Sequence, residues 1–338
     1  MLASATAIPS TLSDYAFSTG SGPVYTRRVQ VESTLAARAR RIELTPARFR
    51  RIAFTSAGWL YLIVVTGATV RLTSSGLGCE HWPGCTAANP FPSKSYHSFI
   101  EFGNRIVSAL TIAATLVAWL ASLVTPGLPR WVRRLALVTF AGTFAQAPLG
   151  AITVYSGLSP WLVMTHFLLA LVILAAGVVV AVQALGLEHG FARERLPLTF
   201  RRGSLVLAVS LLALVATGTV ATASGPHPGS SDVRRLWRLH AAVYVHVRAT
   251  AVFAALFLGG LVYLWQRRGR WPVLLEGMAA LLFLLVIQMG VGELQYRTHL
   301  PWWLVLVHVA FAAAVWAGTV ALVTIAQRTP ASLASAST

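Results

Sequence analysis

Eight long apolar stretches, separated by short polar connections, constrain this chain more than any other feature. They cover residues 53–70, 105–124, 135–154, 161–185, 204–223, 240–265, 273–294 and 302–326. Each is close to the roughly 20 apolar residues that a helix needs to cross the hydrocarbon core of a bilayer. Charged residues make up only 11% of the chain, against about 25% in an ordinary soluble domain, which excludes a water-soluble fold. We therefore expect an all-α polytopic membrane protein with eight transmembrane helices.

The basic residues predict how these helices are oriented. The chain has 27 Lys and Arg against 10 Asp and Glu, a formal net charge of +17. In a soluble protein this charge would indicate a nucleic-acid partner. Here it is concentrated in alternate connections and at the chain ends, the pattern of cytoplasmic segments. We expect a plasma-membrane protein in contact with the lipid bilayer, with both termini cytoplasmic and no nucleic-acid partner. A mitochondrial transit peptide, and hence the mitochondrial inner membrane, is the weaker alternative.

An internal repeat divides the apolar region into two halves. Residues 146–170 laid over 288–312 share eight identical positions, among them Gln146 with Gln288 and His166 with His308, and TGATVRLTSSG also resembles TGTVATASG. This predicts two pseudo-repeated four-helix bundles in the same orientation. The expected organisation is a disordered basic tail (1–50), an N-terminal half (51–185), a cytoplasmic linker (186–203), a C-terminal half (204–327) and a cytoplasmic tail (328–338).

Histidines gather at the outer ends of the predicted helices. Polar side chains at that depth are costly and tend to be functional. His166 and His308 are equivalent in the repeat, and His246 lies at the matching end of the sixth stretch. Imidazoles on neighbouring helices of a bundle are suitable axial ligands for haem. For any single histidine, a hydrogen bond to a lipid headgroup or to backbone is the alternative.

Three further polar side chains lie near the outer end of the first two stretches. Cys79 and Cys85 could close a small disulfide ring on an oxidising side of the membrane, or could be two unrelated buried thiols. Glu101 has an arginine, Arg105, four residues later. The carboxylate is therefore either held in a structural ion pair or free to handle protons.

Several segments resemble the haem A synthase family. They are GATVRLTSSGLGCEHWPGC, IEFGNR, GAITVYSGLSPWLVMTH, SGPHPG and LQYRTHLPWWLVLVH. The resemblance extends over about residues 53–326 and leaves out the N-terminal tail. It implies an enzyme that oxidises the C8 methyl group of haem O to a formyl group, giving haem A for cytochrome oxidase. It also implies a haem O site in the N-terminal half and a bound haem B, with its iron, in the C-terminal half.

The resemblance also implies roles for individual residues. His246 and His308 match the haem B ligands, His166 matches a ligand of the substrate haem, Glu101 matches the functional glutamate, and Cys79 and Cys85 match the outer-loop cysteines. The chain departs from the common family pattern at Asn104, where a histidine is usual, and we expect EFGNR to mark a branch of the family. His97 lies seven residues earlier, about 10 Å along a helix. Either His97 or water would then complete the site opposite His166.

The resemblance leaves partners and a rival function open. Arg71, Arg105 and Arg248 could pair with haem propionates, or reach lipid headgroups. A haem O synthase is an expected partner, and an unidentified electron acceptor is required. The alternative is a di-haem b-type electron-transfer cytochrome, or a haem-binding assembly factor, that does not modify haem. Glu101 and the cysteine pair favour the synthase, because a simple electron carrier has no evident need of them.

Overall fold

A computed structural model of the chain describes residues 43–79, 81, 84–86, 91–92, 95–192, 195–229 and 233–334. The expected disordered tail lies almost wholly outside these residues. The long helices are α2 (Pro46–Leu72), α3 (Tyr96–Leu123), α4 (Arg130–Tyr155), α5 (Pro160–His189), α6 (Leu198–Ser224), α7 (Leu239–Trp265), α8 (Pro272–Arg297) and α9 (Trp302–Gln327), and a short α10 spans Ala331–Ala334. All eight long helices are long and apolar enough to cross a membrane. The all-α polytopic class is confirmed.

Helices α2 and α3 begin well before their apolar stretches, each at a polar cap. Helix α2 starts inside the expected 1–50 tail, where the Thr45 hydroxyl accepts a hydrogen bond from the Arg48 N–H (3.4 Å). Helix α3 starts nine residues before its apolar stretch, where the Ser95 hydroxyl accepts from the Ser98 N–H (3.1 Å). Such caps satisfy N–H groups that a first helical turn leaves unpaired. Hydropathy alone does not detect a polar first turn.

The described part of the C-terminal tail is folded onto the connection between α5 and α6. The Ala192 N–H donates to the Thr329 carbonyl (2.8 Å). The Arg328 guanidinium lies 3.9 Å from the centre of the Phe191 ring. The tail therefore continues the fold at least as far as α10.

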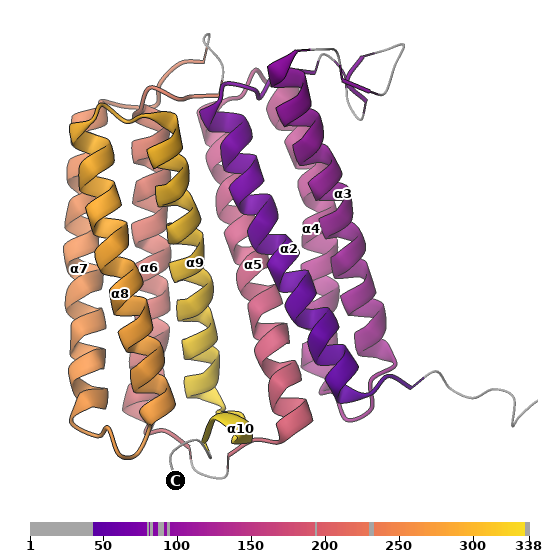
Figure 1. The fold of residues 1–338 in the computed structure, drawn as a ribbon, viewed down its shortest axis with the longest axis vertical. Coiled ribbons are helices and arrows are strands. Elements are labelled where there is room, and N and C mark those ends of the chain that lie inside the picture. The colour runs from indigo at the N-terminus through magenta and orange to yellow at the C-terminus, as the bar shows by residue number, and fades with distance from the viewer. Residues whose placement is uncertain are drawn as a thin grey trace, which may run out of the picture. The chain divides into compact units, whose positions relative to one another are not determined.

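The two halves repeat the same packing. Helix α2 contacts α3 and α5, as α6 contacts α7 and α9; α4 contacts α3 and α5, as α8 contacts α7 and α9. The α4–α5 and α8–α9 connections also share a backbone conformation, because Leu158 and Leu300 both have a positive φ (59° and 61°). These connections lie at one end of the bundle together with the α2–α3 and α6–α7 connections, uppermost in Figure 1. We call it the disulfide end, because Cys79 and Cys85 of the α2–α3 connection form a disulfide. The predicted repeat is thus visible in the fold.

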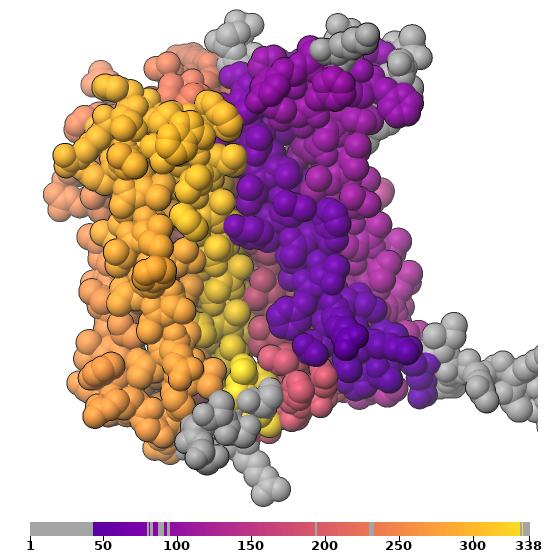
Figure 2. Space-filling model, in the orientation of Figure 1, coloured from indigo at the N-terminus to yellow at the C-terminus, as the bar shows by residue number. Residues whose placement is uncertain are grey.

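Helix α9 joins the halves by packing against α2 and α5. Figure 2 shows its yellow surface beside the indigo surface of α2. The Trp316 indole N–H donates to the Leu171 carbonyl (2.8 Å), and the Tyr61 hydroxyl donates to the Ala310 carbonyl (3.2 Å). A single cluster of buried apolar side chains includes residues of both halves. Residues 43–334 therefore pack around a shared core.

Candidate functional site

A cavity of about 1580 Å³ lies inside the bundle, and all eight long helices contribute to its lining. Sites for single small molecules usually measure about 300–1,000 Å³, so this cavity has room for more than one such ligand. Most of its lining side chains are apolar. His166, His246 and His308 line it, and so do His227 and His240. The structure thus brings the three repeat-related histidines to one cavity.

In the C-terminal half, two histidines reach this cavity from α7 and α9. The Nδ1 atom of His246 lies 3.1 Å from the Thr217 hydroxyl. Gln288 donates through Nε2 to the carbonyl of His308 (2.9 Å). Both imidazoles line the same cavity. With Nδ1 engaged, His246 keeps Nε2 free for a ligand.

Two glycines let these imidazoles lie directly against neighbouring helices. A Cβ added at Gly218 of α6 would lie 3.0 Å from Cε1 of His246, and one added at Gly292 of α8 would lie 3.0 Å from Cε1 of His308. Each of these distances would be shorter than an ordinary van der Waals contact. The imidazole rings therefore lie too close to the two glycines for a larger residue to fit without a shift. Neither these glycines nor Thr217 stands out as a site residue in the sequence, although the Thr217-Gly218 pair and the repeated glycine are visible there.

The N-terminal half has the same arrangement with one side chain changed. Gln146 donates through Nε2 to the carbonyl of His166 (3.1 Å), as its counterpart does in the other half. The Thr66 hydroxyl donates to Oδ1 of Asn104 (2.8 Å). Asn104 therefore occupies in α3 the place that His246 occupies in α7.

The N-terminal site is also less tightly packed. A Cβ added at Gly150 would lie 3.5 Å from Cε1 of His166, and one added at Gly67 would lie 4.0 Å from Oδ1 of Asn104. Both distances are ordinary van der Waals contacts or longer. His166 and Asn104 are therefore packed less closely against the neighbouring glycines than His246 and His308 are.

His97 is not brought to the cavity. Its side chain is exposed in the first turn of α3, and its Nδ1 atom lies 2.9 Å from the Ser75 hydroxyl. It does not belong to the cavity lining, whereas Asn104, about 10 Å further along the helix, does. The structure does not place His97 together with His166.

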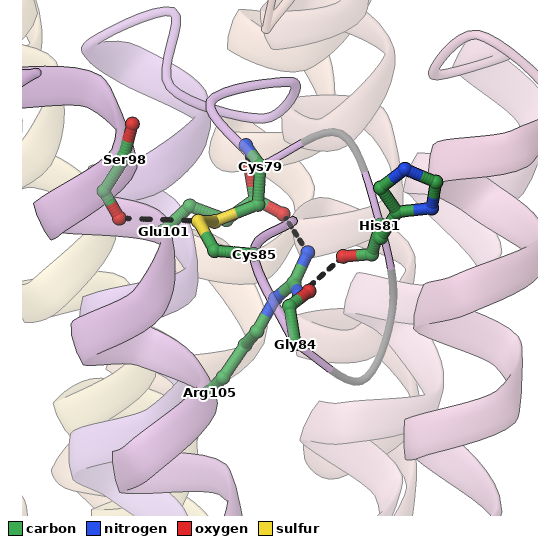
Figure 3. A network of polar contacts seen from close by, with 7 residues as sticks. All are labelled: Cys79, His81, Gly84, Cys85, Ser98, Glu101 and Arg105. Atoms are coloured by element: carbon green, nitrogen blue, oxygen red, sulfur yellow. Dashed lines mark hydrogen bonds and ion pairs between the residues drawn. A yellow bond between two sulfur atoms is a disulfide. The ribbon is translucent and has the colours of Figure 1, made fainter. Parts of the chain in front are cut away.

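Glu101 lines the cavity near the disulfide end, and both of its oxygens are engaged (Figure 3). Oε1 accepts from the Arg105 guanidinium (2.5 Å), and Oε2 accepts from the backbone N–H of Cys79 (2.9 Å). Cys79 and Cys85 form a disulfide, and both are buried. Of the two alternatives for the carboxylate, the structure shows the ion pair, and it adds a bond to the disulfide loop.

Arg105 ties the rest of this loop to α3. It donates to the carbonyls of His81 (2.7 Å) and Gly84 (2.6 Å). The loop also approaches the helix so closely at Gly78 that an added Cβ would lie 2.6 Å from the carbonyl carbon of His97. Only glycine fits there without moving the backbone. The disulfide, Arg105 and this contact hold the loop over the cavity end that contains Glu101.

The three candidate propionate ligands differ in position. Arg71, in the last turn of α2, lines the cavity, and its buried Nε has no hydrogen-bond partner among the described residues. Arg105 also lines the cavity but is engaged with the loop. Arg248 is exposed outside the lining, with its guanidinium 4.9 Å from the centre of the Tyr244 ring. Arg71 is therefore the arginine with unused hydrogen-bonding capacity at the cavity.

Within the part of the chain that the structure describes, no three His, Cys, Asp or Glu side chains cluster as they would around a free metal ion. These described residues therefore offer no site for a metal ion that is coordinated by protein side chains alone. Haem iron needs only one or two axial ligands from the protein. The histidine positions remain suitable for that kind of ligand.

Comparison with known proteins identifies the family. Residues 50–320 match the COX15-CtaA family, described as cytochrome oxidase assembly protein. A "Heme A synthase" of Geobacillus kaustophilus is 24% identical over 291 residues, 82% of this chain and 91% of that protein. One of Geobacillus thermodenitrificans is 25% identical over 290 residues, 82% and 91% of the respective chains. A "Protoheme IX farnesyltransferase" of Thermus thermophilus is 28% identical over 283 residues, 76% of this chain and 45% of that protein. The chain belongs to the COX15-CtaA family.

Proposed function

We propose that this protein is a haem A synthase, a membrane oxidoreductase that converts the C8 methyl group of haem O into a formyl group. The observation that carries the proposal is the arrangement of His246 and His308 in one half and His166 in the other around a single apolar cavity. The names of the Geobacillus relatives support it. The buried carboxylate of Glu101 at the same cavity adds a group that a simple electron carrier does not need.

In this proposal His246 and His308 hold haem B in the C-terminal half. Their rings pack on glycine backbone, which leaves flat space beside them, and the surrounding lining is apolar. Nδ1 of His308 and the side-chain oxygen of Gln288 are both buried without partners among the described residues. Donation from Nδ1–H to that oxygen would satisfy both groups and direct Nε2 to the iron, as second-shell partners of metal-bound histidines do.

Haem O would occupy the N-terminal half, with His166 as ligand of its iron. The same pair of unsatisfied groups, Nδ1 of His166 and the side-chain oxygen of Gln146, is buried there. The free Nε of Arg71 would donate to a haem carboxylate, which is a strong, charge-assisted hydrogen bond. The apolar side chains of both halves would pack against the rings.

The haem groups supply the redox chemistry when bound, and the protein orients them. Conversion of the methyl group into a formyl group takes one oxygen atom from water and releases four electrons and four protons to acceptors outside this chain. The removal of electrons leaves positive charge beside the ring. The carboxylate of Glu101, held as an anion by Arg105, would stabilise that charge in an apolar site where such interactions are strong. Arg105 and the Cys79 N–H keep the carboxylate in place. The removed electrons require an acceptor outside this chain.

The proposed setting is the bacterial plasma membrane, with the disulfide end outside and both termini in the cytoplasm. The basic connections at the opposite end support this orientation. A haem O synthase is the proposed partner. The Thermus relative supports this partner. Its name describes farnesyl transfer to protohaem, and only 45% of its length matches this chain, so a segment similar to this chain occurs there within a longer protein of that name. Reporter fusions at residue 338 and within the α4–α5 connection should report opposite sides of the membrane.

Co-expression with a haem O synthase in a host that lacks haem A tests the proposed reaction. Chromatography of extracted haems should show haem A with the wild-type chain. Glu101→Gln should lower haem A output by at least about tenfold, since a single preorganised electrostatic group can contribute 10²–10³-fold. Glu276→Gln, which changes an exposed carboxylate outside the cavity, is the matched control and should leave output unchanged. If only haem O is extracted with the wild type, the protein is a cytochrome or assembly factor instead.

A further inference from the structure

We infer that the N-terminal half gives haem iron one protein ligand, His166, and leaves the opposite axial position to a small exogenous molecule beside the amide of Asn104. The inference rests on the proposed function in one respect, that a haem occupies this half. It goes further by assigning the two halves different coordination. The ligand class is a small neutral molecule with a lone pair for iron, of the size of water or a diatomic gas.

The first step is the equivalence of Asn104 and His246. Each lies on the second helix of its half and hydrogen-bonds to a threonine of the first helix, Thr66 or Thr217. In both halves a glycine follows that threonine and faces the same side chain, at Gly67 and Gly218. The position that supplies the second imidazole to the C-terminal half is therefore filled by an amide in the N-terminal half.

The second step is that no other side chain of the N-terminal half replaces the missing imidazole. Among the described residues that line the cavity from α2 to α5, His166 is the one histidine, and there is no Met, Cys, Tyr or Lys. Both oxygens of Glu101 are engaged by Arg105 and Cys79. His97 is exposed outside the lining and contacts Ser75.

The third step is the chemistry of the amide itself. Oδ1 of Asn104 accepts from Thr66, so the side-chain NH₂ group keeps its two donor hydrogens. A carboxamide nitrogen has no free lone pair to offer iron, but it can donate a hydrogen bond to a molecule that binds there. A Cβ added at Gly67 would lie 4.0 Å from Oδ1 of Asn104, whereas one added at Gly218 would lie 3.0 Å from Cε1 of His246, so the amide is less closely packed than the imidazole. Asn104 is thus a positioning residue for an exogenous ligand.

Carbon monoxide is the probe that tests this coordination. The full-length protein, co-expressed with a haem O synthase and purified, is reduced and titrated with CO while its absorption spectrum is recorded. A six-coordinate bis-histidine haem does not bind CO readily, whereas a haem with one histidine does. We expect one haem population to bind CO and a second, low-spin population to remain unchanged. His166→Ala should remove the CO-binding population and leave the low-spin one.

Variants at position 104 separate coordination from general damage. Asn104→His should supply the second imidazole, because Thr66 stands where Thr217 stands, and should lower the CO-binding fraction at least about tenfold with a matching rise in low-spin haem. Asn104→Leu should keep CO binding but shift the C–O stretching frequency, because the hydrogen-bond donor is lost.

The two possible failures are distinguishable. If the wild type holds haem in both halves and neither population binds CO, this inference is overturned and the proposed synthase activity stands. The same holds if Asn104→Leu abolishes CO binding while haem content is unchanged. If His166→Ala changes neither haem content nor spectrum, no haem occupies the N-terminal half, and the proposed function falls together with the inference.

Discussion

The two halves of this protein share a helix plan but hold their cavity groups differently. In the C-terminal half a Cβ added at Gly218 or Gly292 would lie 3.0 Å from an imidazole. In the N-terminal half a Cβ added at Gly150 or Gly67 would lie 3.5 Å or 4.0 Å from the facing side chain, and Asn104 replaces the second imidazole. A cofactor that stays bound benefits from rigid ligands, since preorganised groups need not be ordered on binding. A substrate that must leave as product benefits from fewer and looser ones. The comparison supports a resident haem in one half and an exchanging haem in the other.

The halves also differ at the disulfide end. Each carries a Glu and Arg four residues apart on a helix. In the N-terminal half, Glu101 and Arg105 are nearly buried beneath the disulfide loop, with side-chain exposures of 7% and 14%. In the C-terminal half, Glu293 and Arg297 are 59% and 76% exposed. The same local spacing therefore serves a covered site in one half and a solvated pair in the other.

The largest effect is expected from breaking the buried pair. Arg105→Gln should destabilise the protein by about 3–5 kcal/mol, because removal of one partner leaves a buried charge uncompensated. The loop carbonyls of His81 and Gly84 lose their donor as well. The matched change Arg297→Gln should cost at most about 1 kcal/mol, as for other exposed pairs. Thermal unfolding in detergent measures both, and equal losses would show that the halves do not differ here.

Removal of a C-terminal ligand should have the next largest effect. His246→Ala should lower haem B affinity by on the order of 100-fold or more, because loss of an outer-shell partner alone costs about 10–100-fold. Asn104→Ala, at the equivalent position, should leave haem content nearly unchanged, since no iron ligand is lost. The pyridine haemochrome of the purified protein gives the haem content. Similar losses in both variants would contradict the assignment of different ligands.

Smaller effects should follow from filling the glycine positions. Gly218→Ala and Gly292→Ala place a methyl group 3.0 Å from an imidazole and should cost about 1–3 kcal/mol, as overpacking does. Gly67→Ala, where 4.0 Å is available, should be tolerated within about 0.5 kcal/mol. Haem retention during dialysis and the unfolding midpoint report the difference. Retention that is equally good in all three variants would argue against the tighter C-terminal site.

The smallest effect concerns the contact between the halves. Trp316→Phe should cost about 1 kcal/mol, since it removes one hydrogen bond to a carbonyl that also serves its own helix. Trp303→Phe changes an exposed tryptophan of the same helix and should be neutral within about 0.5 kcal/mol. If the two variants unfold at the same temperature, the Leu171 contact does not help to hold the halves together.

Sequence reasoning found much of this fold because a bilayer imposes simple rules. Helix number follows from apolar length, and the repeat from eight shared positions that include His166 and His308. It placed the start of α3 nine residues too late, because caps such as Ser95 are polar. The sequence indicates a cytoplasmic tail from residue 328, and only the structure shows that Arg328 contacts Phe191.

The candidate site was predictable in its chemistry but only partly in its geometry. The sequence supplied His246, His308 and Glu101, and it singled out Asn104 as a departure. It left His97 and Arg248 as candidate ligands, and the structure places both outside the cavity lining. It gave no role to Thr66 or Thr217, because a threonine in a helix forms a useful contact only if a neighbouring helix faces it.

The sequence by itself determined the membrane class, the eight helices, the twofold repeat and the residue types available at each half, since these depend on composition and spacing along one chain. The tertiary structure decided which of those residues share a cavity, which arginine keeps free hydrogen-bonding capacity there, and how tightly each imidazole is held. These properties depend on the rotation and separation of helices that are distant in the chain. How closely each glycine approaches the facing side chain distinguishes the halves, and no local pattern encodes it.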